Sequence, residues 1–354
     1  MRVTLKHIAE RTGKSITTVS RALAGYGDVS EETRELVRRA AREMNYTPNA
    51  LARSLQKRRS RTIGLILPTV GPRFSDPFFT EFLTGVGNMA AERGYDLLLS
   101  VQSPGEGEME LYRRKVSGGQ VDGFVVVRTR RRDPRIDWLV ESAVPFVAFG
   151  RTESAAGFPF VDVDSVKGMR LVGDHLIGLG HRRMVFLSSP PDLLFMGHRL
   201  EGLRQAMAEH GLDPDELRIV KGDLTQKSGY EAAMKLLEEP EIPTAIASCN
   251  DLMALGAMSA LHERGVSVGG DVAVTGFDDI PMAEHSHPPL TTVQQPIYEI
   301  GRMVCEKLVD LIAGEARDTR GEILAPRLIV RSSCGAPRRS TVETGGDGES
   351  WQVS

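Results

Sequence analysis

The sequence holds few cysteines and no long apolar segment. Its 354 residues include three cysteines, at positions 249, 305 and 334. So small and scattered a set excludes a disulfide framework or a zinc knuckle, and it fits a reducing cytosol. No run of about 18 apolar residues is present, so we expect no membrane-spanning helix. The first ten residues lack the apolar stretch of a secretory signal, and together these absences predict a cytoplasmic protein.

Basic residues are concentrated at the start of the chain. The formal net charge is −3. Residues 1–60 nevertheless carry 13 basic and 6 acidic side chains, a charge of +7, and the other 294 residues carry 31 and 41, a charge of −10. This asymmetry indicates that only the first segment meets a polyanion. From charge alone, the alternative is a solvated helix face.

The first 47 residues predict three short helices. Thr4, Ser15 and Ser30 each precede a helical pattern and can cap it, and Gly13 follows the first helix as a C-terminal glycine should. Two helices joined by so short a turn are typical of a helix-turn-helix unit. The apolar residues expected to face the core are Leu5, Ile8 and Ala9 in the first helix, Val19, Ala22 and Leu23 in the second, and Leu36, Val37, Ala40 and Met44 in the third, over residues 31–44.

The second helix presents side chains that can read DNA. Arg21 could bond a guanine at two atoms, and Ile16 or Thr17 could contact a thymine methyl group in the major groove. The alternative is that they are ordinary surface residues of a three-helix bundle. The DNA-contacting residues predicted in this segment are Thr4, Ser15, Ile16, Thr17, Thr18, Ser20 and Arg21.

Residues 4–55 contain TLKHIAERTGKSITTVSRALAG and then VSEETRELVRRAAREMNYTPNALARSL. This stretch closely resembles the DNA-binding head of the lactose repressor (LacI/GalR) family of bacterial transcription regulators, and the resemblance continues through RTIGLILP to about residue 333. It implies a hinge helix over residues 49–55, which Pro48 suits as a first residue. It further implies that paired hinge helices enter the minor groove, where Leu55 wedges a base step; alternatively, Leu55 packs on the rest of the protein. The hinge residues predicted to contact DNA are Asn49, Ala52, Arg53 and Leu55.

Beyond residue 61, short apolar runs alternate with amphipathic stretches. The runs are TIGLILP, DLLLSVQ, GFVVVR, PFVAFG, MVFLSS, AIASCN and DVAVTGF. Such runs are typical of buried parallel strands joined by crossover helices. We therefore predict an α/β protein: a helix-turn-helix head with a hinge helix, then a two-lobed body of parallel sheets flanked by helices. The family resemblance implies that this body is periplasmic-binding-protein-like.

The expected segments follow from these patterns. They are the head (residues 2–47), the hinge and linker (48–60), an N-terminal lobe (61–162 with 292–325), a C-terminal lobe (163–291 with 326–335) and a tail (336–354). The tail is rich in glycine, serine and acidic residues, so we expect it to be disordered.

Polar and aromatic residues follow the predicted strands, where open α/β sheets bind ligands. Aromatic rings beside charged and amide groups suit a sugar. The resemblance matches Arg199, Asn250, Asp251 and Asp278 to the family's effector contacts, and Leu224 stands where relatives often place an aromatic residue. Phe78 and Phe79 could equally be core. The predicted effector-binding residues are Asp76, Phe78, Phe79, Arg128, Arg151, Arg199, Leu224, Asn250, Asp251 and Asp278.

Three strings, DPFFTEFLTGVG, RTRRRDPRIDWL and PFVAFGRT, resemble regulators that respond to α-glucosides. In that case Arg128, Asp133, Arg151 and Arg199 would contact a disaccharide, although residues 130–132 could instead be a solvated run. A loose glycine pattern at residues 85–90 lies inside a helical stretch and not after a strand, so it does not predict a dinucleotide site.

We therefore predict a transcription regulator, a repressor of carbohydrate utilisation, and not an enzyme. A homodimer would bind a pseudo-palindromic DNA operator, and a sugar would bind between the lobes. The dimer contacts are expected from helices near Phe78, Val86, Ala254 and Met282. No nucleophile elbow occurs, and we expect no metal, no cofactor and no membrane partner. The alternatives are a transport-type sugar-binding protein without a DNA role, and a body with glucosidase activity, which would need paired carboxylates.

Overall fold

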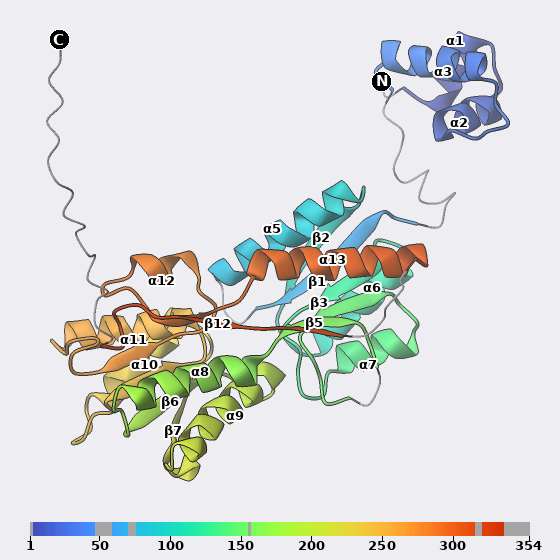
Figure 1. Ribbon diagram of the computed structural model, residues 1–354. Coiled ribbons are helices and arrows are strands. Elements are labelled where there is room, and N and C mark those ends of the chain that lie inside the picture. Colours follow the sequence, from blue (N-terminus) through green and yellow to red (C-terminus); the bar gives the residue numbers. More distant parts are fainter. Residues whose placement is uncertain (1–2, 47–58, 70–75, 155–156, 316–320, 336–354) are drawn as a thin grey trace, which may run out of the picture. The chain divides into compact units, whose positions relative to one another are not determined.

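The computed structural model describes residues 3–46, 59–69, 76–154, 157–315 and 321–335. The predicted tail and the hinge residues Asn49, Ala52, Arg53 and Leu55 lie outside these ranges. The chain divides into two compact units, residues 1–60 and residues 61–354, and we call the second unit the body (Figure 1). Within the described ranges, no helix is both long enough and apolar enough to cross a membrane.

The head consists of three helices, α1 (Leu5–Thr12), α2 (Ile16–Ala24) and α3 (Glu31–Glu43). The helix ends at Ser15, Ser30 and Gly13 form as predicted. The Ser15 hydroxyl accepts a hydrogen bond from the backbone N–H of Thr18 at 3.0 Å, and the Ser30 hydroxyl accepts one from Thr33 at 3.4 Å. Gly13 ends α1 in the left-handed conformation, with a φ of 65°.

The head has its own small core, and one predicted member of it is wrong. Leu36 is 41% exposed. Successive residues of a helix lie about 100° apart, so a stripe that includes Val37 continues through Ala40, Ala41 and Met44 and leaves Leu36 facing solvent. Met44 is the C-cap of α3 and not its last helical residue.

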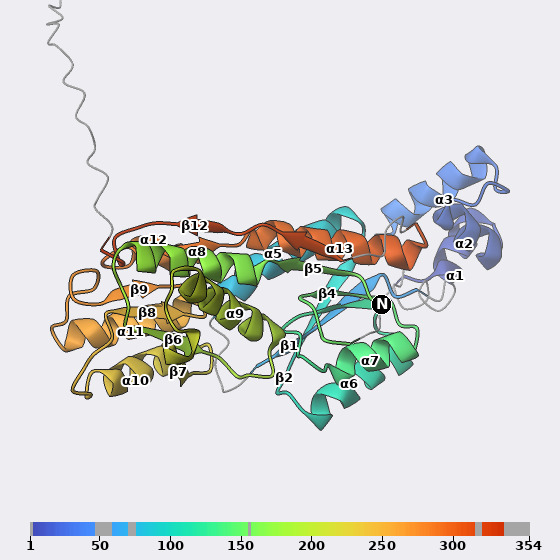
Figure 2. The same ribbon diagram turned by 60° about the horizontal axis from the view of Figure 1, so that its bottom comes forward.

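The N-terminal lobe of the body is built on a six-stranded parallel sheet, ordered β11-β5-β4-β3-β1-β2. Helices α5 and α13 pack together over one face, while α6 and α7 cover the other, as the two separate core clusters show (Figures 1 and 2). The elements are β1 (Thr62–Pro68), α5 (Pro77–Glu92), β2 (Asp96–Gln102), α6 (Glu106–Ser117), β3 (Gly123–Val126), α7 (Pro134–Glu141), β4 (Phe146–Phe149), β5 (Phe160–Val163), α13 (Ile297–Ala313) and β11 (Glu322–Leu324).

The C-terminal lobe contains a four-stranded parallel sheet, ordered β7-β6-β8-β9. Helix α8 pairs with α9 and α10 pairs with α11, and an antiparallel ribbon of β10 and β12 completes the body. The elements are α8 (Ser165–Gly178), β6 (Met184–Ser188), α9 (Leu194–Glu209), the 3-10 turn η1 (Pro214–Glu216), β7 (Arg218–Lys221), α10 (Gln226–Leu236), β8 (Ala245–Ser248), α11 (Asp251–Glu263), β9 (Ala273–Thr275), α12 (Pro281–His285), β10 (Thr292–Gln294) and β12 (Arg327–Ile329).

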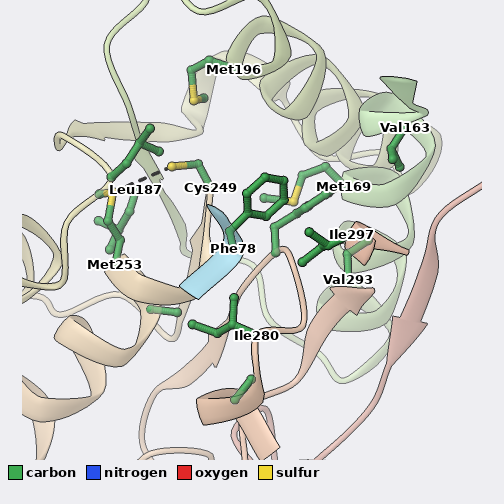
Figure 3. Close-up of a cluster of buried hydrophobic side chains, with 14 of the residues drawn as sticks. Phe78, Val163, Met169, Leu187, Met196, Cys249, Met253, Ile280, Val293 and Ile297 are labelled. Atoms are coloured by element: carbon green, nitrogen blue, oxygen red, sulfur yellow. Dashed lines mark hydrogen bonds between the residues drawn. The ribbon is translucent and has the colours of Figure 1, made fainter. Parts of the chain in front are cut away.

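One hydrophobic cluster is continuous through both lobes. It includes Phe78 of α5, Met169 of α8 and Ile297 of α13 (Figure 3). All seven predicted apolar runs are strands, and the α/β architecture is as predicted. Five strands were not predicted: β5, β7, β10, β11 and β12. Each has only three or four residues. None of the residues of β7, β11 and β12 is fully buried, and Asp162 interrupts the apolar run of β5, so these strands lack the longer apolar runs that marked the others.

Candidate functional site

A cavity in the body is lined by residues of both lobes and encloses about 680 Å³, its open mouth included. Its walls come from the segments that follow β3, β4, β8 and β9, and from the starts of α5, α8 and α9. The lining residues are Asp76, Phe78, Phe79, Arg128, Thr129, Phe149, Gly150, Arg151, Asp162, Ser165, Leu194, Phe195, His198, Arg199, Leu224, Asn250, Asp278 and Gln295.

An aromatic wall forms one side of the cavity. Phe78 stacks on Phe149, with ring centroids 5.8 Å apart and an interplanar angle of 17°. Phe79 meets Phe78 edge to face at 5.3 Å. The guanidinium of Arg128 lies 4.9 Å from the centroid of the Phe79 ring. Both phenylalanines are almost fully buried, so each is core and lining at once, because the core continues up to the cavity wall.

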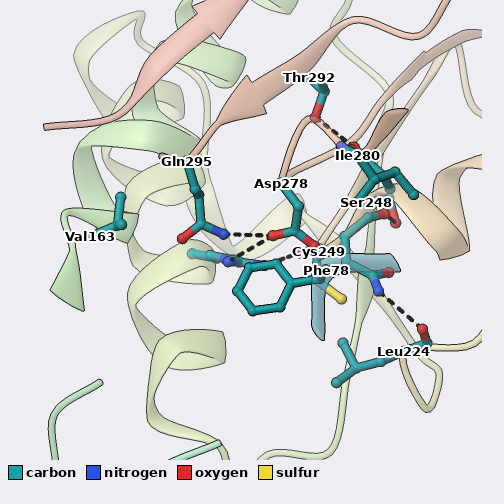
Figure 4. A network of polar contacts seen from close by, with 12 residues as sticks. Phe78, Val163, Leu224, Ser248, Cys249, Asp278, Ile280, Thr292 and Gln295 are labelled. Carbon is teal, nitrogen blue, oxygen red and sulfur yellow. Dashed lines mark hydrogen bonds and ion pairs between the residues drawn. The ribbon is translucent and has the colours of Figure 1, made fainter. Parts of the chain in front are cut away.

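Buried polar groups form the floor of the cavity. The side-chain amide of Gln295 donates to Oδ1 of Asp278 at 2.6 Å, and a guanidinium nitrogen of Arg199 lies 3.5 Å from the same oxygen (Figure 4). Arg199 also donates to the backbone oxygen of Cys249, and its guanidinium lies 3.6 Å from the ring centroid of Phe277. Burial raises the pKa of Asp278 well above its usual range, against the opposing charge of Arg199.

Two further arginine–carboxylate pairs line the walls. Arg128 lies 3.4 Å from Asp76, and burial raises the pKa of that carboxyl group despite the arginine. Arg151 donates to Asp162 at 2.6 Å and lies 3.3 Å from Nδ1 of His198 on the other lobe. Three arginines therefore match three carboxylates, and the charged side chains that line the cavity balance.

The backbone is strained at several lining positions. Arg128, Leu224 and Asp278 have left-handed φ values of 51°, 71° and 126°, a conformation that favours glycine. The carbonyl of Leu224 accepts a hydrogen bond from the side chain of Asn250 at 3.0 Å (Figure 4). Residues held in such conformations cluster at ligand-binding sites.

Asp251 does not line the cavity, so its prediction as an effector contact is wrong. It is fully buried. Its carboxylate accepts hydrogen bonds from the hydroxyl of Thr292 at 2.5 Å and from the backbone N–H of Ile280 at 2.9 Å. Asn250 caps α11 and faces the cavity, whereas Asp251 begins the helix and faces the ribbon. Asp251 therefore holds β10 and the start of α12 together.

Asp133 does not line the cavity either, so its prediction as a disaccharide contact is wrong. It caps α7 and forms a fully buried pair with Arg135, whose guanidinium donates to it at 2.6 and 2.8 Å. Arg130 donates to buried Glu108 at 2.6 Å, and Arg131 pairs with a glutamate across its loop. Arg130 is thus held inside the loop, whereas Arg131 and Arg132 are exposed to solvent.

The sequence patterns missed half of the lining. Phe195 lies four residues before the predicted Arg199 along α9, so helical spacing from that arginine could have found it, and His198 lies three residues after Phe195 on the same helix. Gln295 follows β10, a strand too short to be predicted. The lining residues that were not predicted are Thr129, Phe149, Gly150, Asp162, Ser165, Leu194, Phe195, His198 and Gln295.

Most of the residues in the head that were predicted to contact DNA are exposed to solvent. Ile16 is 50% exposed and Thr17 and Arg21 are also exposed on α2. The hydroxyl of Ser15 already accepts the hydrogen bond that caps α2. Thr4 precedes α1, and its backbone N–H donates to Nδ1 of His7. The side chains of Thr18 and Ser20 are partly buried.

Comparison with known proteins places both units. Residues 4–49 match the family described as "Bacterial regulatory proteins, lacI family", and residues 173–334 match a "Periplasmic binding protein-like domain". The HTH-type transcriptional regulator AglR of Rhizobium meliloti (strain 1021) is 36% identical over 345 residues, which covers 96% of this chain and 97% of that protein.

Two solved structures are similar over almost the whole chain. A "transcriptional regulator CelR-cellobiose complex" has a TM-score of 0.72 and 36% identity, covering 94% of this chain and 100% of the other. A lac repressor dimer bound to operator and the anti-inducer ONPF has a TM-score of 0.82 and 28% identity, covering 94% and 99%. The predicted fold class is thereby confirmed. So is the prediction that the chain is not an enzyme, because these relatives are named as transcription regulators. The chain belongs to the lacI family of bacterial regulatory proteins.

Proposed function

We propose that this chain is a sequence-specific DNA-binding transcription regulator, a repressor of carbohydrate utilisation genes, whose operator affinity is controlled by a sugar. The observation that carries this proposal is the presence in one chain of a helix-turn-helix head and a body with a charge-balanced, aromatic-walled cavity. We place the protein in the cytoplasm, where operator DNA lies. The similar CelR was solved with cellobiose, and the similar lac repressor was solved as a dimer on its operator.

The charges and rings of the cavity support an uncharged sugar as the ligand. Each of Arg128, Arg151 and Arg199 already pairs with a carboxylate. A phosphorylated sugar would bring uncompensated negative charge beside Asp76 and Asp278, which is costly in a buried site. A carbon–hydrogen face of a glucose unit can pack on the aromatic wall while its hydroxyls bond the charged pairs. Our candidate ligand is an α-glucoside. Cellobiose, the β-linked disaccharide in the CelR complex, is the ligand against which it should be compared.

We propose that the ligand acts by stabilising one of two arrangements of the lobes relative to the other. Backbone hydrogen bonds cross between them: the N–H of Arg131 donates to the oxygen of Asp192 at 2.8 Å, and the N–H of Leu194 donates to Thr129 at 3.2 Å. A ligand shifts such an equilibrium only by its differential affinity, and the coupling to DNA is typically about 1–3 kcal/mol.

The dimer proposal has support from an exposed apolar edge. Leu99 and Val101 are 41% and 53% exposed on β2, the edge strand beside α5, and Met282 of α12 is 40% exposed. Paired in a homodimer, two heads would meet two half-sites of a pseudo-palindromic operator. The lobe limits given above, 61–162 with 292–325 and 163–291 with 326–335, remain part of this proposal.

The hinge residues carry a separate expectation. If Leu55 wedges a base step, Leu55→Ala should weaken operator binding by roughly 1–3 kcal/mol, because the kink and the additional contacts that it allows outweigh the cost of unstacking, and leave sugar affinity unchanged. Gel-shift titration and calorimetry of the full chain measure the two quantities. An unchanged operator affinity would remove the wedge role from Leu55.

The first experiment is a thermal unfolding series of the full chain with α- and β-linked glucose disaccharides and a phosphorylated sugar. A ligand at 100 times its dissociation constant adds about 2.7 kcal/mol to the state that binds it. We expect a clear shift with a neutral disaccharide and none with the phosphosugar. Operator selection from a random duplex library then separates the two candidate functions. A regulator should enrich one DNA sequence, whereas a transport-type sugar-binding protein should enrich none.

A further inference from the structure

In the head, Arg21 is held by a side chain that the sequence patterns did not single out. Its Nε donates to Oδ1 of Asp28 at 3.2 Å, and one terminal nitrogen donates to the other carboxylate oxygen. The contact is therefore a two-point pair on one edge of the guanidinium. The guanidinium also lies 5.1 Å from the ring centroid of Tyr26.

Asp28 lies in the loop between α2 and α3 (Figure 1), and contacts within the head hold this loop in place. Val29, the next residue, is buried in the head core. Arg34 of α3 donates to the backbone oxygens of Tyr26 and Val29 at 3.3 and 3.0 Å. Gly25 turns the chain out of α2 with a φ of 79°. The carboxylate thus faces Arg21 from a loop of defined shape.

This pair is poorly placed to stabilise the fold. The side chains of Arg21 and Asp28 are 45% and 54% exposed, and exposed ion pairs contribute little to stability. What the pair does fix is the direction of the arginine. A guanidinium has five N–H donors, and Asp28 occupies the edge made by Nε and one terminal nitrogen. One terminal nitrogen keeps its second N–H and the other keeps both, and on this outer edge no partner is found among the described residues. That edge matches O6 and N7 of guanine.

We propose that Asp28 is a positioning residue that sets the base specificity of Arg21, by holding the outer edge of its guanidinium toward one guanine in each operator half-site. The inference rests on the proposed function, since it requires a DNA site read by α2. An arginine oriented before binding loses less rotational freedom when it meets the base. The same carboxylate repels phosphates, so an arginine paired with it is better suited to a base edge than to the backbone.

The test uses the full chain and an operator selected from a random duplex library. Affinities are measured for the selected operator and for duplexes with each base pair replaced in both half-sites, using wild type, Arg21→Ala, Asp28→Asn and the double variant. We expect one guanine position at which wild type discriminates by roughly 5- to 150-fold, the range of a bidentate contact. Asp28→Asn should lower that discrimination at least about threefold, with non-specific affinity unchanged or increased by the lost negative charge. In the Arg21→Ala background Asp28→Asn should not change base discrimination further, as expected of residues that act as one unit.

Glu10→Gln is the matched control, because it removes one negative charge from an exposed head residue whose partner is Lys6 and not Arg21. It should leave base discrimination intact, and Asp28→Glu should retain most of it. Unchanged discrimination in Asp28→Asn would overturn the inference. So would an equal loss of affinity for all sequences together with a lower melting temperature, which indicates a structural role. If wild type selects no operator at all, the proposed function fails instead.

Discussion

Arg199 and Asp278 form a buried pair of opposite charges on the floor of the cavity. Arg199 is 5% and Asp278 8% exposed, and each compensates a charge that would otherwise be buried alone. We expect Arg199→Met to lower the free energy of unfolding of the body by about 3–5 kcal/mol, because it leaves the Asp278 carboxylate without its partner. Urea unfolding of the full chain, followed at the body transition, measures this loss.

The matched control is the double variant Arg199→Met with Asp278→Asn, which removes both charges. Replacing a whole buried pair is often nearly neutral, so most of the lost stability should return. Neither variant should respond to sugar, since both lack the polar floor. Stability that stays low in the double variant would mean that Arg199 acts through packing on Phe277 and not through charge.

Asp251 gives the body an unusual dependence on pH. Burial raises its pKa from an ordinary value near 3.8 to about 6, so the folded chain binds this proton more tightly than the unfolded chain. The resulting stability is fully present below about pH 4 and is lost as pH rises through about 6. At 1.36 kcal/mol per pKa unit, the contribution is on the order of 3 kcal/mol.

Asp251→Asn should abolish this contribution while keeping an oxygen that can accept from Ile280. We expect the stability difference between wild type and the variant to shift in favour of wild type as pH falls from 7 to 4, measured by urea unfolding at each pH. The comparison of the two chains cancels the titration of groups that do not interact with Asp251, whereas Asp278, whose pKa Asp251 helps to raise, titrates together with it. A difference independent of pH would show that Asp251 is ionised in the folded body throughout this range.

Single residues also show where prediction from sequence ended. Arg199 and Asp278 were found because they stand in motifs that resemble those of a known family, and the structure places both on the cavity. Asp251 stands in such a motif too, yet it points to Thr292 on a distant segment. Whether a residue at a strand's end faces the cavity or the core depends on the strand beside it, and β10 was not visible in the sequence.

Among the elements, the body's helix pairs meet at glycines. In α5 and α13, a Cβ at Gly85 would lie 2.1 Å from the backbone oxygen of Tyr298, and one at Gly301 would lie 2.3 Å from that of Phe82. The pairs α8 with α9 and α10 with α11 repeat this close approach at Gly202 and Gly229. Of the two glycines in the loose dinucleotide pattern, Gly85 is thus a contact point between helices, a role that spacing alone could not reveal.

Two neighbouring glycines of α5 give a matched test of this packing. Gly85→Ala should destabilise the body by about 1–3 kcal/mol or more, because the added methyl group overlaps backbone. Gly87 has no atom within 4 Å of its Cβ position, so Gly87→Ala should be neutral or stabilise by up to about 1 kcal/mol through helix propensity. Thermal unfolding of both variants decides the matter. Similar effects at the two positions would mean that α5 and α13 are not in close contact.

For the whole molecule, function requires that the cavity and the head influence one another. The cavity draws its walls from both lobes, and contacts such as Arg151 with His198 span them, so a ligand there can favour one lobe arrangement. Residues 47–58, which join head and body, lie outside the described ranges. The contacts described within each unit therefore do not tell how a change in the body reaches the head. The coupling must therefore be measured as a free energy between two binding events.

Reciprocity makes that measurement decisive. If sugar changes operator affinity by some factor, operator DNA must change sugar affinity by the same factor, typically about 5- to 150-fold. Calorimetric titration of sugar into the full chain, with and without saturating operator, should give the factor found by operator titration with and without sugar. Arg21→Ala is the control, because it should bind sugar normally while the same DNA concentration leaves its sugar affinity nearly unchanged. Equal sugar affinity with and without operator in the wild type would mean that the two units bind independently, and the cavity would then have no part in controlling DNA binding.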